Sequence, residues 1–385
     1  MSTQVILPRL MQVGAEAAAQ LPEVLASLGC NRPLIITDPM MVKLGYVDQI
    51  RQLLEQQQFP VDVFADTVPE PTVSSIQAGV ERVRQGEFDC LVALGGGSPI
   101  DSAKAIGILG CHGGEMRDYR FPRQVNEAGL PLIAIPTTAG TGSEATRFTI
   151  ITDDDTDEKM LCVGLGFMPV AALVDFTLTL SLPARTTADT GIDALTHAIE
   201  AYVSRKASPY SDQQALAAMR LIGPNLRRVY RDGSDREARE AMMLGSTLAG
   251  MAFSNASVAL VHGMSRPIGA AFHVPHGLSN AMLLPTVTEF SIPAAETRYA
   301  DCARAIGVAA VEDGTAAAND KLLAELKSLN EDLEVPTPAA FGIERDAFFD
   351  IMATMAEQAL QSGSPGNNPR VPTAEEIVSL YRALW

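Results

Sequence analysis

The sequence predicts an α/β domain built on a parallel sheet, followed by an all-α domain. Short β-branched runs alternate with longer helical patterns in the first half of the chain, whereas the second half carries long segments rich in Ala, Leu and Met. Alternating strands and helices form βαβ units and hence parallel sheets. We therefore expect two domains, 1–183 and 184–385, in agreement with a length of 385 residues at roughly 150 residues per domain.

Five runs predict the strands of the sheet: PLIIT at 33–37, VDVF at 61–64, DCLVAL at 89–94, PLIAIP at 131–136 and AALVD at 171–175. Helices are predicted between them, because apolar residues recur there at helical spacing. These helices lie at 14–29, 40–58, 73–87 and 99–109. We expect them to cover both faces of the sheet.

The second half is predicted to be helical after Pro183, which ends the preceding pattern. The Thr and Asp residues of SLPARTTADTG are candidate N-caps for the first helix. The predicted helical segments are 186–204, 210–229, 235–254, 295–306, 314–329, 344–361 and 373–384.

The composition excludes several classes of protein. Twenty-nine Lys and Arg face 46 Asp and Glu, for a formal charge of −17, so we expect no nucleic-acid and no membrane partner. No apolar stretch approaches the roughly 20 residues that span a bilayer, and we see no secretion signal. The five cysteines are dispersed without a CxxC pair, which disfavours disulfides and structural zinc and favours the cytoplasm.

A glycine-rich turn follows the third predicted strand in DCLVALGGGSPIDSAKAI. Glycines let a ligand approach the backbone, and the free amides at a helix start attract an anion. The turn therefore indicates a phosphate site, although neither the usual dinucleotide fingerprint nor the P-loop fingerprint is present. A tight turn without a ligand remains the alternative.

Polar residues also follow two other predicted strands. The loop PTTAGTGSE after 131–136 carries hydroxyls that could hold phosphate or ribose. Asp38 ends the first strand, where a carboxylate can bind ribose hydroxyls and repel a 2′-phosphate, which favours NAD over NADP. A polar surface loop and a simple Asp-Pro turn remain the alternatives.

The helical half contains a candidate cation site. Asp193 and His197 are four residues apart and so share one helix face. Three of the five histidines, His262, His273 and His276, lie within fifteen residues. Imidazole and carboxylate groups suit Fe, Zn, Mn or Co better than Ca or Mg. Packing remains the alternative for any single histidine, and we interpret His112 as a loop residue without function.

GGGSPIDSAKA, TTAGTGSE, Asp193-x3-His197 and His262-x13-His276 together resemble the iron-containing (group III) alcohol dehydrogenase family over nearly the whole chain. The resemblance implies a Rossmann-like N-terminal domain, a helical metal-binding C-terminal domain, NAD, and Fe²⁺ with Zn²⁺ as an alternative. The metal ligands that it implies are Asp193, His197, His262 and His276. The cofactor-binding residues that it implies are Asp38, Gly95, Gly96, Gly97, Ser98, Asp101, Thr137, Thr138, Thr141, Ser143 and Lys159.

One position departs from the family pattern. Members commonly carry a histidine four residues after the third ligand, where this chain has Arg266, and a guanidinium cannot act as a base near neutral pH. We take His273 as the candidate for proton transfer and Arg266 as a candidate to bind an anionic group on the substrate. Both could merely pair with acidic neighbours or water. Phe253 matches an aromatic residue near the family's substrate channel, or simply packs within a helix.

The expected function is reversible hydride transfer between a small primary alcohol and NAD, assisted by a cation that polarises the substrate oxygen. A dehydroquinate-synthase-like or glycerol-dehydrogenase-like enzyme of the same superfamily is an alternative. A metal-dependent hydrolase is a further alternative, but it would leave the glycine-rich turn unused. The resemblance also implies a homo-oligomer, such as a dimer.

Overall fold

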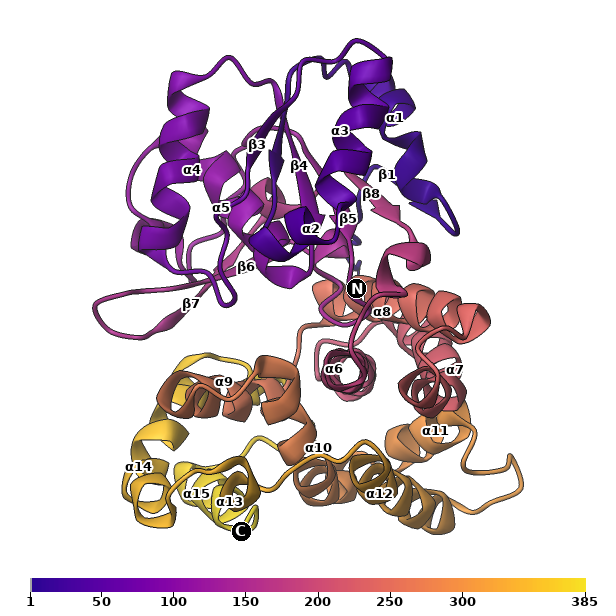
Figure 1. Ribbon diagram of the computed structural model, residues 1–385. Coiled ribbons are helices and arrows are strands. Elements are labelled where there is room, and N and C mark those ends of the chain that lie inside the picture. The colour runs from indigo at the N-terminus through magenta and orange to yellow at the C-terminus, as the bar shows by residue number, and fades with distance from the viewer. Residues whose placement is uncertain (1) are drawn as a thin grey trace. The chain divides into compact units, whose positions relative to one another are not determined.

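The computed structural model describes residues 2–385, which divide into two compact units. One unit is Ile6–Leu180, and the other is Ser181–Trp385 together with the N-terminal segment that ends at Val5. Figure 1 shows the helices and strands of both units. The domain boundary predicted after Pro183 stays a prediction.

A six-stranded parallel sheet forms the centre of the first unit, as the sequence predicts. Its strand order is β1-β8-β5-β4-β2-β3, and every pair is parallel. The strands are β1 (Leu10–Val13), β2 (Pro33–Ile36), β3 (Asp62–Phe64), β4 (Cys90–Gly95), β5 (Leu132–Pro136) and β8 (Ala171–Val174). The five predicted runs form β2, β3, β4, β5 and β8, and the edge strand β1 is an addition.

Helices cover both faces of this sheet, because alternate residues of each strand point to opposite faces. Leu91 and Ala93 of β4 belong to one core with α4 and α5, whereas Val92 and Leu94 belong to a second core with α1 and α3. Figure 1 shows α1 and α3 apart from α4 and α5. The helices are α1 (Leu21–Leu28), α2 (Pro39–Lys43), α3 (Tyr46–Gln56), α4 (Val73–Gln85) and α5 (Gly97–His112).

An antiparallel hairpin, which the sequence analysis does not predict, joins β5 to β8. Its strands are β6 (Phe148–Thr152) and β7 (Lys159–Val163), with Phe148 opposite Val163. Its first strand alternates buried and partly exposed residues, as a strand with one covered face does. The short helix η3 (Ser143–Ala145) precedes it and connects it to the loop after β5.

The second unit is helical, which confirms the prediction. Among the described residues no single helix is long and apolar enough to span a membrane, and only α8 with α9, bent by 103°, meet that test as a pair. The predicted segments correspond to α6, α7, α8, α11, α12, α14 and α15, and α9, α10 and α13 are additions. The helices are α6 (Ala184–Val203), α7 (Pro209–Arg231), α8 (Arg236–Ala256), α9 (Leu260–Phe272), α10 (His276–Ser291), α11 (Glu296–Ile306), α12 (Thr315–Asp332), α13 (Pro338–Phe341), α14 (Arg345–Gln361) and α15 (Ala374–Arg382).

Candidate functional site

Helix α6 presents a polar face inside the helical unit. Asp193, His197 and Glu200 are all buried there, with relative exposures of 2, 4 and 3%. Their spacing of four and then three residues places them on one side of the helix. Buried charged groups need partners, and α9 and α10 supply them.

A sharp turn between α9 and α10 brings two histidines together. His262 lies in the first turn of α9, and His276 is the first residue of α10. Between them, His273 ends α9 in the left-handed region at φ 54°, and Pro275 caps the start of α10. A Cβ atom at Gly277 would lie 2.2 Å from the Asp189 carbonyl oxygen, so only glycine lets α10 approach α6 this closely.

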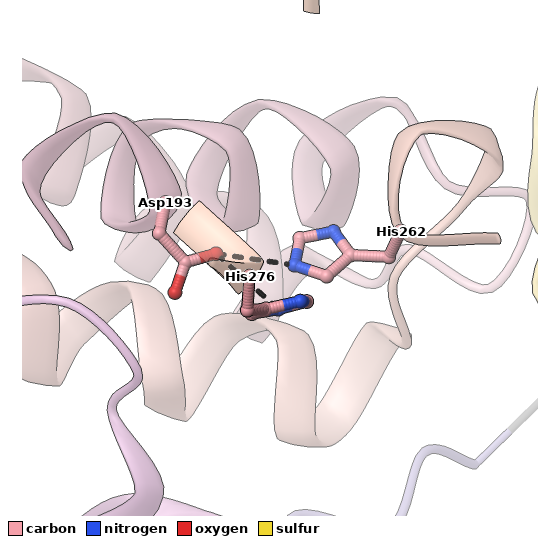
Figure 2. A group of neighbouring side chains, drawn as sticks. All are labelled: Asp193, His262 and His276. Carbon is pink, nitrogen blue, oxygen red and sulfur yellow. Dashed lines mark ion pairs between the residues drawn. The ribbon is translucent and has the colours of Figure 1, made fainter. Parts of the chain in front are cut away.

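Three side chains converge on one point (Figure 2). Ligand atoms of Asp193, His262 and His276 all lie within 4.8 Å of one another. The Asp193 Oδ1 atom is 3.4 Å from His262 Nε2 and 3.7 Å from His276 Nε2. Donor atoms placed tetrahedrally at roughly 2.1 Å around a cation are about 3.4 Å apart. The spacing therefore fits a divalent cation whose ligand atoms lie at roughly 2.1 Å.

His197, the fourth predicted ligand, lies beside this group rather than within it. Its Nε2 atom is 3.9 Å from Asp193 Oδ1. Its ring stacks on His262 at 4.4 Å and on Phe253 at 4.1 Å. The structure thus brings Phe253, predicted to lie near the substrate, into contact with a candidate ligand.

The charges of the cluster stabilise one another. Burial raises the pKa of the Asp193 carboxyl, but His197, His276 and His262 outweigh burial and hold that pKa well below its ordinary value. The Asp193 and His262 side chains are each only 3% exposed, whereas His276 is 32% exposed. His276 is therefore the member of the cluster that is partly accessible to solvent.

Glu200 is a residue that the sequence analysis misses. Its carboxylate accepts hydrogen bonds from the backbone N–H groups of Ala259, at 2.9 Å, and Val261, at 2.6 Å. It also accepts the Nδ1–H of His262 at 2.6 Å, which leaves His262 Nε2 facing Asp193. A carboxylate at a metal-binding histidine typically fixes the ring and its tautomer. The spacing of seven residues from Asp193 is a signal that could reveal it.

Arg266 lies one turn beyond His262 on α9. The residue is 9% exposed, and its Nη1 atom donates to Ser364 Oγ at 3.1 Å. Its Nε atom is buried without a hydrogen-bond partner among the described residues. Burial lowers the pKa of Arg266 to about 10, opposed by the charge of Glu200. His273, in contrast, is exposed at the turn.

The predicted cofactor residues of the α/β unit gather at the carboxyl end of the sheet. Gly95 ends β4, Asp38 follows β2 and Thr137 follows β5, on three neighbouring strands. A Cβ at Gly96 would lie 3.2 Å from Thr138 Cγ2, and one at Gly97 would lie 2.7 Å from Thr141 Cγ2. The two loops are therefore packed against each other, as the convergence of parallel strands predicts.

Thr137, Gly95 and Asp38 stand in different surroundings at the ends of these three strands. Thr137 is 1% exposed, and its Oγ1 has no hydrogen-bond partner among the described residues. Gly95 adopts φ 150°, and a Cβ there would lie 2.5 Å from Pro99 Cγ, so glycine lets Pro99 pack against the turn. Asp38 caps α2 through Oδ1, which accepts the N–H groups of Met40 and Met41 at 2.8 and 3.0 Å.

Asp101 and Ser143 bind each other. Asp101 Oδ1 accepts the Ser143 hydroxyl at 2.6 Å, and Oδ2 accepts the Ile150 N–H at 3.0 Å. Ser98 and Lys159 are linked in a similar way by Glu70, whose N–H donates to Ser98 Oγ at 3.2 Å and whose carboxylate pairs with Lys159 Nζ at 2.9 Å. These four predicted residues thus join the helix α5 to the hairpin and to the short helix η3 before it.

Lys104 completes this connection, and the sequence analysis misses its role. Its buried Nζ donates to Ser143 Oγ at 2.9 Å, to the Phe148 carbonyl at 2.7 Å, and to both oxygens of Thr146 at 3.1 Å. Burial lowers the pKa of Lys104 to about 8, against the opposing charges of Asp101 and Glu144. The loop before β6 is therefore held on α5 by one buried cation.

Comparison with known proteins assigns the chain to a family. Residues 8–176 match the model for iron-containing alcohol dehydrogenase, and residues 187–385 match the model for the Fe-containing alcohol dehydrogenase family, C-terminal. The chain belongs to the iron-containing alcohol dehydrogenase family and is an oxidoreductase. The resemblance found in the sequence is thereby confirmed.

Several relatives match along almost their full length. Long-chain-alcohol dehydrogenase 1 of Geobacillus thermodenitrificans (strain NG80-2) is 42% identical over 388 residues, which cover 99% of this chain and 96% of the relative. Lactaldehyde reductase of Escherichia coli (strain K12) is 34% identical over 388 residues and 100% of both chains. The crystal structure of a 1,3-propanediol oxidoreductase matches with a TM-score of 0.95 and 34% identity over 100% of both chains.

Replacing Glu200 with Gln should weaken cation binding by about 10- to 100-fold. The glutamine keeps the size of the side chain but has one acceptor oxygen to serve three donors, so His262 loses its fixed orientation. Competition with a chromophoric chelator measures the affinity for Zn²⁺. The matched control is Glu237→Gln, since that side chain is 83% exposed. Unchanged affinity in Glu200→Gln would contradict the assigned role.

Replacing Lys104 with Met should remove a pH-dependent part of the stability. The pKa of this lysine is about 8 in the folded chain and 10.5 ordinarily. Between these values the unfolded chain binds more protons, so the group makes folding more favourable as pH rises. Between pH 8 and pH 10, the free energy of unfolding in urea should rise by about 2 kcal/mol more for the wild type than for Lys104→Met. For the exposed control Lys327→Met, the free energy of unfolding should change with pH as it does in the wild type. The same pH dependence in Lys104→Met would refute this account.

Proposed function

We propose that this protein catalyses the reversible NAD-dependent oxidation of small primary alcohols to aldehydes at a divalent cation. The observation that carries the proposal is the convergence of Asp193, His262 and His276 within 4.8 Å, in a chain of the iron-containing alcohol dehydrogenase family. A bound Fe²⁺ or Zn²⁺ would supply Lewis acidity toward the substrate oxygen, and NAD would accept the hydride.

The protein's own residues would hold and shield this chemistry. Asp193, His197, His262 and His276 would hold the cation, and Glu200 would orient His262 through its 2.6 Å contact with Nδ1. Phe253, stacked on His197, would exclude water from that side. His273 is proposed to exchange the proton with solvent, because it is exposed at the turn that ends α9.

The α/β unit would bind NAD. Asp38 would accept the ribose hydroxyls, and the glycine turn of Gly95, Gly96 and Gly97 would hold the phosphates with the start of α5. Thr137, Thr138 and Thr141 would donate from the facing loop. Ser98, Asp101, Ser143 and Lys159 would act mainly by holding these loops in place, since each bonds another protein group.

Two further proposals concern the surroundings of the enzyme. Association into a homo-oligomer such as a dimer is supported by β1, which is an edge strand of the sheet and ends in Val13, 49% exposed, because an open strand edge can pair with another chain. A cytoplasmic location stays a prediction from the dispersed cysteines, four of which are buried.

His262→Ala should lose both the cation and turnover. An alcohol and aldehyde panel with NAD⁺ and NADH, run with and without added Fe²⁺, measures turnover, and metal analysis of anaerobically prepared protein measures loading. The control is His112→Ala in the α/β unit, where the His112 ring Nε2 lies 2.9 Å from the Ala128 carbonyl oxygen of the same unit. Turnover retained in metal-free His262→Ala would defeat the proposal. Net accumulation of NADH separates it from dehydroquinate-synthase-like chemistry.

Arg266→Gln should discriminate between charged and neutral substrates. If the incompletely partnered guanidinium binds an anionic group, kcat/KM for an ω-hydroxy acid falls by about 10- to 100-fold, since hydrogen bonds to charged groups contribute roughly 1.5–3 kcal/mol. The neutral alcohol of the same length should change by less than about 2-fold, which corresponds to roughly 0.4 kcal/mol. Equal losses of kcat/KM for both substrates would show that Arg266 does not bind an anionic group of the substrate.

A further inference from the structure

Asn280 contacts all three members of the candidate cation site, although no sequence motif points to it. This residue of α10 is fully buried. Its Nδ2 atom donates to Asp193 Oδ1 at 2.7 Å. The same atom lies 3.1 Å from His262 Nε2 and 3.3 Å from His276 Nε2. One amide nitrogen therefore borders the position where the three donor atoms converge.

The two ends of this amide are not equally satisfied. Nδ2 faces the Asp193 carboxylate and two ring nitrogens, whereas Oδ1 is buried without a hydrogen-bond partner among the described residues. Buried acceptors are almost always paired in folded proteins, so an orphaned oxygen next to a cation site requires an explanation. Rotation about the last side-chain bond exchanges the amide nitrogen and oxygen. After that rotation the oxygen would face the donor atoms.

We propose that Asn280 belongs to the coordination shell of the cation. Before the cation is present, the amide N–H groups donate to Asp193 Oδ1 and lie against the ring nitrogens of His262 and His276. With the cation present, an N–H directed at it would be repelled, and the amide presents Oδ1 instead. Asn carbonyl oxygen is a ligand of Ca²⁺, and carbonyl oxygens also suit Mn²⁺, one of the metals that imidazole and carboxylate groups bind. The inference rests on the proposed function only in requiring a cation at this site.

Two substitutions test the proposal, because they should change the cation affinity in opposite directions. Asn280→Ala removes the oxygen donor, and Asn280→Asp keeps the shape and adds a negative charge. The matched control is Asn319→Ala on α12. Asn319 is likewise buried, donates once through Nδ2 to the Glu296 carbonyl at 3.1 Å and has an unpartnered Oδ1, but it is not among the residues of the cluster.

The measurements are cation affinity and a spectroscopic signature. Zn²⁺ and anaerobic Fe²⁺ are titrated in competition with a chromophoric chelator, and the visible spectrum of bound Co²⁺ reports the ligand set. We expect Asn280→Ala to weaken binding by about 10-fold or more and to shift the Co²⁺ spectrum. We expect Asn280→Asp to strengthen binding, and Asn319→Ala to match wild type in both measurements.

Other outcomes overturn the proposal. If Asn280→Ala binds Zn²⁺ as tightly as wild type, or more tightly, with the same Co²⁺ spectrum, Asn280 only packs the helices. If Asn280→Ala does not fold, the isosteric Asn280→Asp decides. The proposal is wrong if Asn280→Asp leaves both the Co²⁺ spectrum and the Zn²⁺ affinity unchanged. A wild type that binds the cation without oxidising any alcohol would sink the proposed function and leave this test intact.

Discussion

The buried carboxylate of Asp193 is the constraint on which the helical unit depends. An isolated ion in a protein interior is very costly, and it is tolerated only with partners in good geometry. The partners of Asp193 come from three helices: its own, the one that carries His262 and the one that carries His276. Each helix must therefore keep its place, or the carboxylate loses compensation. The geometry of the site therefore depends on the packing of these helices.

A buried cation plays the corresponding part in the α/β unit. Lys104 is 2% exposed, and its ammonium group donates to oxygens of the segment before β6 and of Phe148, the first residue of β6. That segment contains the short helix η3 (Ser143–Ala145) and no strand of the main sheet. The contacts of Asp101 with Ser143 and Ile150 act in the same direction. Lys104 and Asp101, both on α5 beyond the glycine turn, thereby hold the segment that follows the loop packed against that turn.

The sequence predicts the central strands well because they are buried on both faces and form continuous apolar runs. It does not predict β1, since LMQV is short and lies half exposed at an edge, or the hairpin, whose strands flank the acidic turn DDDTDE. The histidines stand out because the chain has only five. Glu200, Asn280 and Lys104 escape because their roles arise from contacts between elements far apart in the chain. Only Glu200 has a local signal, its place one further turn along the face of Asp193 and His197.

The close approach of Gly277 to Asp189 has a consequence for attempts to evolve this enzyme in the laboratory. Any larger side chain at 277 would push α10 outward and carry His276 with it, so the position cannot be varied freely although it adjoins a ligand. Asn280 lies one turn further along the same helix. Its side chain can be replaced by one of the same shape and different chemistry, such as aspartate. A library aimed at accepting another metal should therefore diversify 280 and hold 277 constant.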